Sequence, residues 1–453
     1  MKKILFFLMA GLLSINISAQ TKKTVSKSPN GYIRCYSTEY EKSLQKKNNR
    51  RASTDVFENW IATKISKQKT FNQRITAVRT IPVVVHVVNK GEEVGTGTNI
   101  SDTQVISQIT TLNNDYRKKS GTRGFNTNPV GADANIEFAL AVRDPNGNPT
   151  NGIDRISYNK DFWDESAVET ELKPNTIWDP TKYLNIWVVN FGGDLDGVLG
   201  YAQFPEASTL DGLNYPPFTA NTDGVVIGHQ FFGNLDYDDG SFNLDPTYGY
   251  GRTTTHEIGH WLGLRHIWGD SNCGTDYVAD TPIHKTENYG CFTHPKTNTC
   301  LPPTADEMFE NYMDYTNDSC MDTFTAKQKT RMQTCMLNGT RRNSLNTSNG
   351  SVAPSAGVYF KLDKGYCSVT EGTNCSFTDV NYKVGIIKAP TANTLVNFTV
   401  DGTSTATDMI DFQIMTPSVT FPSGSTADQT MTIRYFNDAV TESSEIVKIN
   451  LAV

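Results

Sequence analysis

Hydrophobic and polar positions follow several different periods along the 453-residue chain, and each period predicts a different kind of element. The run from Ile81 to Val88 is β-branched and apolar, as a buried strand should be. Apolar positions then recur at helical spacing after Ser101-Asp102-Thr103-Gln104, which resembles a capping box and predicts the start of a helix. Further strands are predicted at 136–142, 184–189, 200–205 and 225–227. This succession predicts a mixed α/β domain.

The pattern changes after a polar linker at 346–355 (NTSNGSVAPS), which contains Gly and Pro. Helical periodicity disappears beyond the linker. Alternating segments at 397–400 and 431–435 predict that residues 356–453 form an all-β sandwich. Because the chain ends at Val453 directly after a strand-like segment, a domain truncated from a longer protein is one expectation.

The first residues have the composition of an export signal. Lys2 and Lys3 precede an apolar segment, Ile4 to Leu13, and Ile17-Ser18-Ala19 offers a cleavage site before Gln20. We therefore interpret 1–19 as a signal peptide of a secreted protein, the alternative being a buried N-terminal helix. Export implies an oxidising environment, in which the eight cysteines become candidates for disulfides.

Charge is unevenly distributed. The chain has a net charge of −7, but residues 21–79 carry +10 and residues 80–453 carry −19. The overall acidity argues against nucleic acid as a partner, and no later apolar stretch is long enough to span a bilayer. The basic stretch is either a solvated tail or a pro-segment, 20–79, held electrostatically on an acidic mature domain and removed later. We favour the pro-segment.

The strongest chemical signal is HExxHxxGxxH at 256–266. His256 and His260 lie one helical turn apart, so both imidazoles can reach one ion. Gly263 can end the helix and let the chain turn to bring in His266. Three neutral imidazoles suit Zn²⁺ and leave a fourth position for water, and Glu257 is the candidate general base for that metal-activated water. A structural histidine cluster is the alternative.

The long motif is that of the metzincin metallopeptidases, in which a methionine-containing turn lies beneath the metal. Asn311-Tyr312-Met313-Asp314-Tyr315 supplies such a turn. Together with Trp261, Ile267-Trp268-Gly269 and the run NYMDYTNDSC, these residues resemble the pappalysin family, especially its ulilysin-like bacterial members, over about 81–345. The resemblance implies a metzincin catalytic domain, 80–345, with a mixed sheet and an active-site helix. It also implies that Met313 underlies the zinc without ligating it and that Tyr315 assists the metal or the tetrahedral intermediate.

Four cysteines follow the motif, and the sequence alone leaves three pairings open. The resemblance implies the bridges Cys273–Cys300 and Cys291–Cys320. A second metal cluster is the competing use of these thiols, and export makes it unfavourable.

Residues 276–282 lie between these cysteines and offer hard oxygen ligands of the type that Ca²⁺ prefers. Similar family members bind calcium in this segment, so Asp276, Asp280 and Thr281 are the candidate ligands. A polar turn with a solvated face is the alternative.

Cys35 is the only cysteine of the basic segment. Its thiolate could displace the catalytic water and keep the enzyme latent, as family proforms with a cysteine in this region suggest. A bridge to Cys335, or no role, is the alternative. Cys367 and Cys375 are expected to pair within the C-terminal domain.

The C-terminal segment resembles a Calx-β domain in Asp401-Gly402-Thr403, in 419–424, and from Asn437-Asp438 to Glu445. Asn437-Asp438 replaces the usual pair of acids, so the resemblance does not carry calcium binding with it. Protein, glycan or the cell surface are the candidate partners of this domain.

We therefore expect a secreted zinc endopeptidase made as a zymogen, with protein or peptide substrates lying along the edge strand 200–204. Arg74 and Arg79 are candidate maturation sites. Some relatives favour Arg or Lys after the scissile bond, but Ser319 stands where the acid for that preference would suit, so basic specificity is not predicted. The alternative function is a calcium-dependent adhesin or carbohydrate-binding protein with a minor or inactive zinc domain, against which the intact Glu257 argues.

Overall fold

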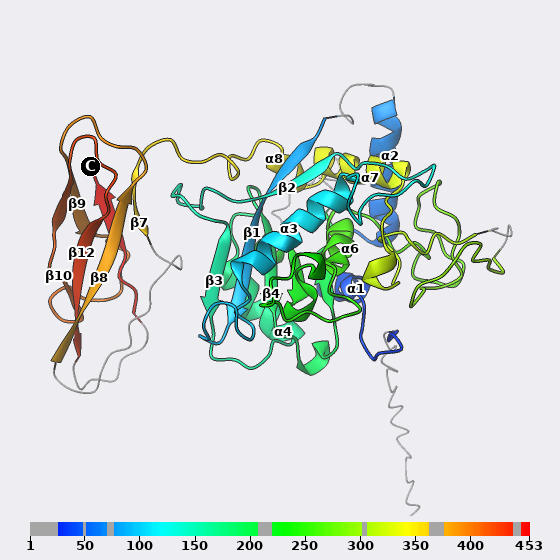
Figure 1. The fold of residues 1–453 in the computed structure, drawn as a ribbon, viewed down its shortest axis with the longest axis horizontal. Helices are drawn as coiled ribbons and strands as arrows, with labels where there is room; N and C mark the ends of the chain where they lie inside the picture. Colours follow the sequence, from blue (N-terminus) through cyan, green and yellow to red (C-terminus); the bar gives the residue numbers. More distant parts are fainter. Residues whose placement is uncertain are drawn as a thin grey trace, which may run out of the picture.

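The computed structural model describes residues 26–48, 51–69, 77–206, 220–300, 306–361, 376–437 and 445–453. These form a large α/β body and a set of C-terminal antiparallel sheets, joined by the extended segment that follows α8 (Figure 1). The predicted signal peptide 1–19, Arg74, and Cys367 and Cys375 lie outside the described residues.

The body is built on a six-stranded mixed sheet with the order β2-β1-β4-β6-β5, with β3 also paired to β1. The central strand β1 runs parallel to β2, β3 and β4, whereas the edge strand β5 runs antiparallel to β6. The sheet confirms the predicted mixed α/β class, but β3 was not predicted. The strands are β1 Arg79–Asn89, β2 Ile136–Leu140, β3 Ile153–Ser157, β4 Leu184–Val189, β5 Gly200–Ala202 and β6 Val225–Gly228.

Two helices pack against the sheet around the main core, α3 Asp102–Tyr116 and α6 Arg252–Trp261. Ser101 caps α3 as predicted, since its hydroxyl accepts from the Gln104 N–H at 3.2 Å. The reciprocal half of the capping box is absent, because the Gln104 side chain donates to the carbonyl oxygen of Phe232 at 2.7 Å. A tertiary hydrogen bond therefore engages the Gln104 side chain, which a capping box would use within the helix.

The remaining helices are short or peripheral. They are α1 Ser37–Lys47, α2 Thr54–Lys69, α4 Glu165–Ala167, α5 Lys173–Thr176, α7 Ala326–Asn338 and α8 Arg342–Leu345, with single turns η1 Val168–Leu172, η2 Gly193–Leu195, η3 Ala220–Thr222, η4 His229–Phe231, η5 Leu235–Tyr237 and η6 Asp318–Cys320. None of the described helices has both the length and the apolar composition that a membrane crossing requires.

The C-terminal part consists of two antiparallel sheets, as predicted for an all-β region. One has the order β10-β12-β8-β7 and the other β11-β9-β13. Buried residues of both sheets, including Val384, Phe398 and Met431, form one separate core between them. The strands are β7 Val358–Lys361, β8 Ser376–Ile386, β9 Thr394–Val400, β10 Phe412–Ile414, β11 Ser418–Phe421, β12 Gln429–Asn437 and β13 Ile449–Ala452.

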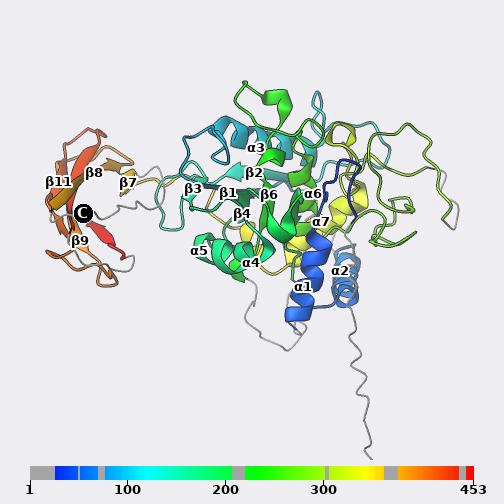
Figure 2. The ribbon, with the colours of Figure 1, turned by 90° about the horizontal axis from the view of Figure 1, so that it is seen from below.

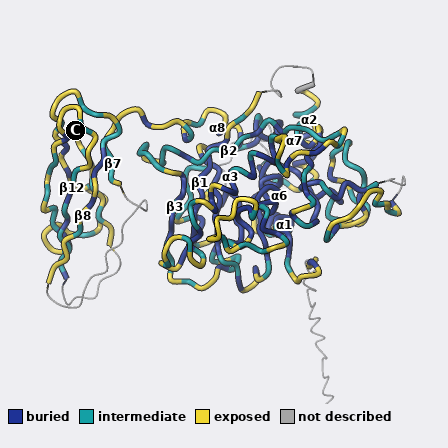
Figure 3. Tube along the Cα trace, in the orientation of Figure 1, coloured by how far each residue is buried: buried dark blue, intermediate teal, exposed yellow. Residues whose placement is uncertain are grey.

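The basic N-terminal segment folds onto the body instead of forming a solvated tail. Helix α1 lies against β5 and α2 lies against α7. Figure 2 shows both helices on the same side of the body, close to α6. All ten residues of α6 are buried, and Figure 3 shows the helix in the dark interior of the body. The candidate site therefore lies between the protein's own core and its basic segment.

Candidate metal centre

Helix α6 carries the first two histidines of the motif. The Nε2 atoms of His256 and His260 lie 3.1 Å apart, as expected for residues one turn apart on one face. Gly259, between them, allows the methionine turn to approach, because a Cβ atom there would lie only 2.5 Å from the sulfur of Met313. Met313 is completely buried beneath the helix. The glycine therefore sets the distance between α6 and this turn.

The chain leaves α6 through Gly263, whose φ of +90° is in the region that favours glycine. The N–H of Gly263 donates to the carbonyl oxygen of His260 at 2.8 Å, which closes the last turn. Three residues further, the chain has reversed and brought in His266, whose Nε2 lies 3.1 Å from that of His260. The three Nε2 atoms thus converge as the motif predicts.

Each histidine ring is held through its other nitrogen. The Nδ1 of His256 faces the carbonyl oxygen of Tyr312 at 2.7 Å, and that of His260 faces a backbone carbonyl oxygen at 2.9 Å. Asp270 Oδ1 lies 2.5 Å from the Nδ1 of His266. A carbonyl oxygen only accepts, so the proton of these rings sits on Nδ1 and the Nε2 lone pair points to the centre. Burial lowers the pKa of His256 and of His260 well below the ordinary value, which keeps both rings neutral.

Cys35 completes the cluster from the basic segment. Its Sγ and one nitrogen of each histidine lie within 4.8 Å of one another, and this is the only group of its kind among the described residues. Burial is the largest of the causes that raise the pKa of the Cys35 thiol, followed by the charge of Glu257. Three imidazoles and one thiol, all buried, form a donor set that fits tetrahedral Zn²⁺.

Glu257 is also engaged by the basic segment. The hydroxyl of Ser37 donates to its Oε2 at 2.6 Å, and the Cys35 thiol donates to the same oxygen at 3.4 Å. The carboxyl is completely buried, and burial raises its pKa to about 7. The candidate general base is therefore capped by the same segment that supplies the thiol.

The backbone of residues 33–37 lies along the edge strand. Ile33 donates to the carbonyl oxygen of Gly197 at 2.8 Å and accepts from Leu199 at 2.9 Å, in a parallel bridge. Tyr36 donates to the carbonyl oxygen of Gly200 at 3.1 Å. The strand expected to receive an extended substrate is thus occupied by the chain's own N-terminal segment.

Arg34 fills a buried pocket beside the cluster, which sequence reasoning missed. Its guanidinium donates to Asp318 Oδ1 at 2.6 Å and to the hydroxyl of Thr253 at 2.5 Å, and it lies 4.7 Å from the ring centre of Tyr248. Both charged side chains are fully buried. Two backbone N–H groups at the start of α6 hold the other oxygen of Asp318, each at 3.0 Å. Position 319 is the one considered for an acid from the sequence, and it holds Ser319. The acid that faces an arginine in the structure is the preceding residue, Asp318.

Tyr315 lies next to the cluster, with its hydroxyl 3.1 Å from the Nε2 of His266. Trp268 stacks on the other face of that ring at 4.4 Å between centres. The cysteine-rich segment nearby contains the bridges Cys273–Cys300 and Cys291–Cys320, the pairing that the resemblance implies. Cys35 and Cys335 are both free and buried, so the alternative bridge between them is not formed.

Two of the three candidate calcium ligands lie together, and the third has other partners. Asp276 is buried and accepts from the hydroxyl of Thr281 at 2.9 Å, and burial raises its pKa to about 6. Asp280 instead accepts from a hydroxyl at 2.7 Å and a backbone N–H at 2.9 Å at the N-terminus of α7. The structure therefore pairs Asp276 with Thr281 and gives Asp280 a helix-capping position.

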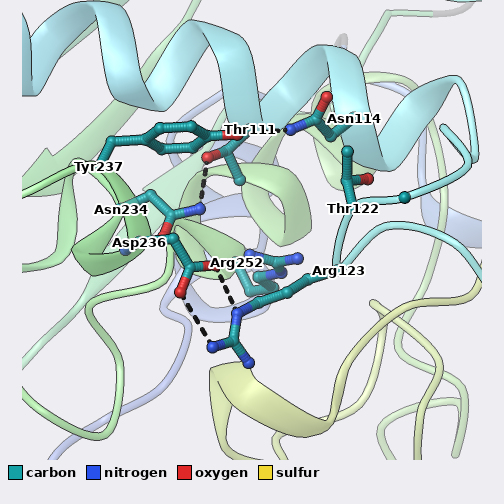
Figure 4. A pocket seen from close by; sticks show the side chains of 9 residues that line it. Thr111, Asn114, Thr122, Arg123, Asn234, Asp236, Tyr237 and Arg252 are labelled. Atoms are coloured by element: carbon teal, nitrogen blue, oxygen red, sulfur yellow. Dashed lines mark hydrogen bonds and ion pairs between the residues drawn. The ribbon is translucent and has the colours of Figure 1, made fainter.

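A pocket of about 270 Å³ lies at the start of α6, where Arg252 contributes to its lining (Figure 4). Its charges are compensated, because Arg123 pairs with Asp236 and Arg252 pairs with Asp115. None of the four clustered donors lines it. The lining residues are Thr111, Asn114, Gly121, Thr122, Arg123, Asn234, Asp236, Tyr237 and Arg252.

The chain is similar to one family model and to several extracellular metalloproteases. The model of the Peptidase_M43 family, described as pregnancy-associated plasma protein-A, matches residues 166–337. An extracellular metalloprotease of Colletotrichum graminicola is 32% identical over 281 residues, covering 60% of this chain and 84% of that protein. One of Neurospora crassa is 31% identical over 263 residues, covering 57% and 75% respectively.

Two solved structures from Tannerella forsythia are also similar. Mature mirolysin in complex with a cleaved peptide is 43% identical, with a TM-score of 0.50, over 60% of this chain and 96% of that chain. A promirolysin mutant is 37% identical, with a TM-score of 0.55, over 71% of this chain and 99% of that chain. The second match extends over more of this chain than the first.

Proposed function

The chain belongs to the Peptidase_M43 family, and we propose that it is the zymogen of a protease whose catalytic centre is formed by His256, His260, His266 and Glu257. It is an extracellular zinc metalloprotease, and its substrates are proteins. The observation that carries the proposal is the convergence of three imidazole Nε2 atoms and the Cys35 thiol within 4.8 Å. Promirolysin, a similar protein, is by its name a precursor form.

The domain organisation follows from this assignment. We propose a signal peptide over 1–19, a pro-segment over 20–79, a protease domain over 80–345, a linker over 346–355, and a C-terminal domain over 356–453. The two packed antiparallel sheets are compatible with the Calx-β resemblance of the last domain. Its partner, whether protein, glycan or cell surface, would be identified by binding assays with the intact chain.

Zinc would be held by His256, His260 and His266, with Met313 beneath them. The donor set fits this ion, because the three rings are buried and each is oriented by its Nδ1 partner. When bound, zinc supplies a Lewis acid that polarises the scissile carbonyl group.

The remaining chemistry falls to two side chains. Glu257, next to His256 on α6, takes the proton of the attacking water and passes it to the leaving amine. Tyr315, with its hydroxyl beside His266, is placed to donate to the oxyanion that forms on the carbonyl oxygen.

Latency would result from a double block by the pro-segment. Cys35 occupies the fourth position of the cluster, and Ser37 holds the carboxylate of Glu257. Removal of both requires cleavage between the pro-segment and the protease domain. Arg79 lies within β1 and pairs with Ile136 of β2, so cleavage there would have to break the sheet, which leaves Arg74 as the better candidate.

The pocket of Arg34 supports a preference for a basic residue next to the scissile bond. The Oδ2 atom of the buried Asp318 carboxylate accepts from two backbone N–H groups, which leaves Oδ1 as a strong acceptor for a guanidinium. We therefore propose that Asp318 recognises Arg or Lys of the substrate, in the place that Arg34 takes in the zymogen.

We also propose that Ca²⁺ binds in the cysteine-rich segment through Asp276 and Thr281. A buried carboxylate next to a hydroxyl oxygen supports this. Asp280 becomes a ligand only if it leaves the N-terminus of α7.

Peptide profiling by mass spectrometry tests the catalytic proposal. The full chain, activated by limited trypsin treatment, is compared with the Glu257→Ala variant treated in the same way, each with and without a zinc chelator. Cleavage seen only with zinc and Glu257 is the expected result, and the products report the preferred residue. A folded, zinc-loaded protein that cleaves equally well without Glu257 would overturn the assignment of the base.

A further inference from the structure

We propose that Arg265 and Arg331 form a carboxylate-binding site on the protease domain, outside the metal centre, for a glutamate flanked by an aromatic residue of a protein segment. In the zymogen this site is filled by α2, whose Glu58 accepts from Arg265 at 3.0 Å and from Arg331 at 2.6 Å. All three charged side chains are at least nine-tenths buried.

The aromatic half of the site lies beside the arginines. The ring of Phe57 is 5.9 Å from the guanidinium carbon of each arginine, and it packs against Gly263 at the end of α6. The surface that receives the ring is therefore made of fixed elements of the protease domain. Arg331 is itself held by a hydrogen bond of 2.6 Å to the carbonyl oxygen of Gly263.

After maturation the two arginines would lack the carboxylate that neutralises them in the zymogen, and the site could bind another one. Within the described residues, Glu58 is the only ion-pair partner of either arginine. Residues 80–453 carry a net charge of −19, so two buried arginines with no partner from their own domain are unusual there. If the pro-segment is removed, as the proposed function requires, two guanidiniums and an aromatic slot that α2 had covered are uncovered without an acidic partner among the described residues. A carboxylate is the ligand that matches two converging guanidinium groups.

The site is close enough to the metal centre for one substrate to use both. Phe204 separates them, with its ring 5.0 Å from that of His260 and 4.4 Å from the guanidinium carbon of Arg265. An acidic–aromatic segment of a bound protein would thus be held one side chain away from the scissile bond.

Fluorescence anisotropy with a labelled peptide of residues 51–69 tests the site. The protein is the full chain with Glu257→Ala, from which trypsin and gel filtration have removed the pro-segment, so the peptide is not degraded. Because the variant is inactive by design, a negative result here does not bear on proteolysis. The Glu58→Gln peptide should bind about tenfold more weakly or worse, since it loses two charge-assisted hydrogen bonds.

The Asp55→Asn peptide is the matched control, because Asp55 is exposed on the same helix. It should bind within about twofold of the unmodified peptide, as surface charges contribute little. Arg331→Met in the protein should weaken binding of the unmodified peptide and reduce the difference between it and the Glu58→Gln peptide, because only the bond from Arg265 then remains. Equal affinities of these two peptides for the unmodified site, or no binding of the unmodified peptide, would overturn the proposal.

Discussion

The metal centre has two sides that are held in different ways. The histidine side is local, since His256, His260 and His266 lie within eleven residues, and each Nδ1 is fixed by a neighbouring carbonyl or carboxylate of the same domain. The thiol side comes from more than 200 residues away in the chain, and Cys35 and Ser37 reach Glu257 across the edge strand. One side can therefore be removed without changing the other. This is the property that a zymogen needs: the ligand geometry exists before activation, and activation only uncovers it.

The largest expected effect comes from breaking the histidine side. His260→Ala removes the ligand that lies 3.1 Å from both of its partners, so zinc should be lost before and after activation, and casein cleavage with it. Zinc per chain, measured by atomic absorption, checks the first result. His294→Ala is the matched control, because His294 is half-exposed and pairs with Asp306 away from the cluster. Retention of one zinc per chain by His260→Ala would contradict the assignment.

Breaking the Arg34 pocket should change specificity rather than metal binding. Asp318→Asn removes the buried charge that faces a guanidinium, so the kcat/KM ratio between peptides with Arg and with Ala after the scissile bond should fall about 100-fold. Zinc content should stay at one per chain. The Asp306→Asn variant, which changes a partly exposed acid that pairs with His294, serves as a control for net charge. An unchanged ratio would show that the pocket holds Arg34 without selecting substrates.

Asp270 contacts both a histidine of the cluster and the basic segment, so its substitution shows which of the two contacts supports zinc binding. It holds the Nδ1 of His266 at 2.5 Å, and its other oxygen accepts from Thr38 of the basic segment at 3.2 Å. Asp270→Asn should weaken zinc binding by the activated protease about 10- to 100-fold, as loss of a carboxylate partner of a ligating histidine does. Competition with a chromophoric chelator measures the affinity. Thr38→Val can act only in the uncleaved chain, because activation removes Thr38. An effect of Asp270→Asn that is confined to the uncleaved chain would contradict this division of roles.

The smallest expected effect concerns the cysteine-rich segment. If Ca²⁺ binds at Asp276 and Thr281, saturating calcium should raise the Tm of the chain by about 5 °C, through preferential binding to the folded state. Asp276→Asn should abolish that rise, whereas Asp280→Asn should lower the Tm at every calcium concentration by weakening the cap of α7. Differential scanning fluorimetry distinguishes the two. A calcium effect that survives Asp276→Asn would place the ion elsewhere.

The sequence predicted the local parts of this site well. The spacing of the histidines determines which helix face they share, and Gly263 marks the turn that brings in His266. The mixed sheet was also predictable, because its central strands are long apolar runs. These features depend on residues close together in the chain.

The missed features are those that depend on distant residues. Arg34 and Asp318 are 284 positions apart, so no local pattern indicates that they form a buried pair. Glu58 and Arg331 are 273 positions apart and were missed for the same reason. Strand β3 was missed because Ile153–Ser157 mixes charged and apolar residues, one of which, Arg155, is buried by pairing with Asp102. Tertiary packing determines the structure at such positions, and no local sequence pattern indicates that packing.

X-ray absorption spectroscopy of the zinc-loaded, uncleaved chain tests the two-sided centre most directly. The account predicts three nitrogen donors near 2.0 Å and one sulfur donor at about 2.3 Å. In the Cys35→Ser variant, and in the protease after removal of the pro-segment, the sulfur should be lost while the three nitrogens remain. A spectrum of the uncleaved chain without a sulfur donor, or one that keeps sulfur after Cys35→Ser, would contradict the assignment of Cys35 as the removable ligand.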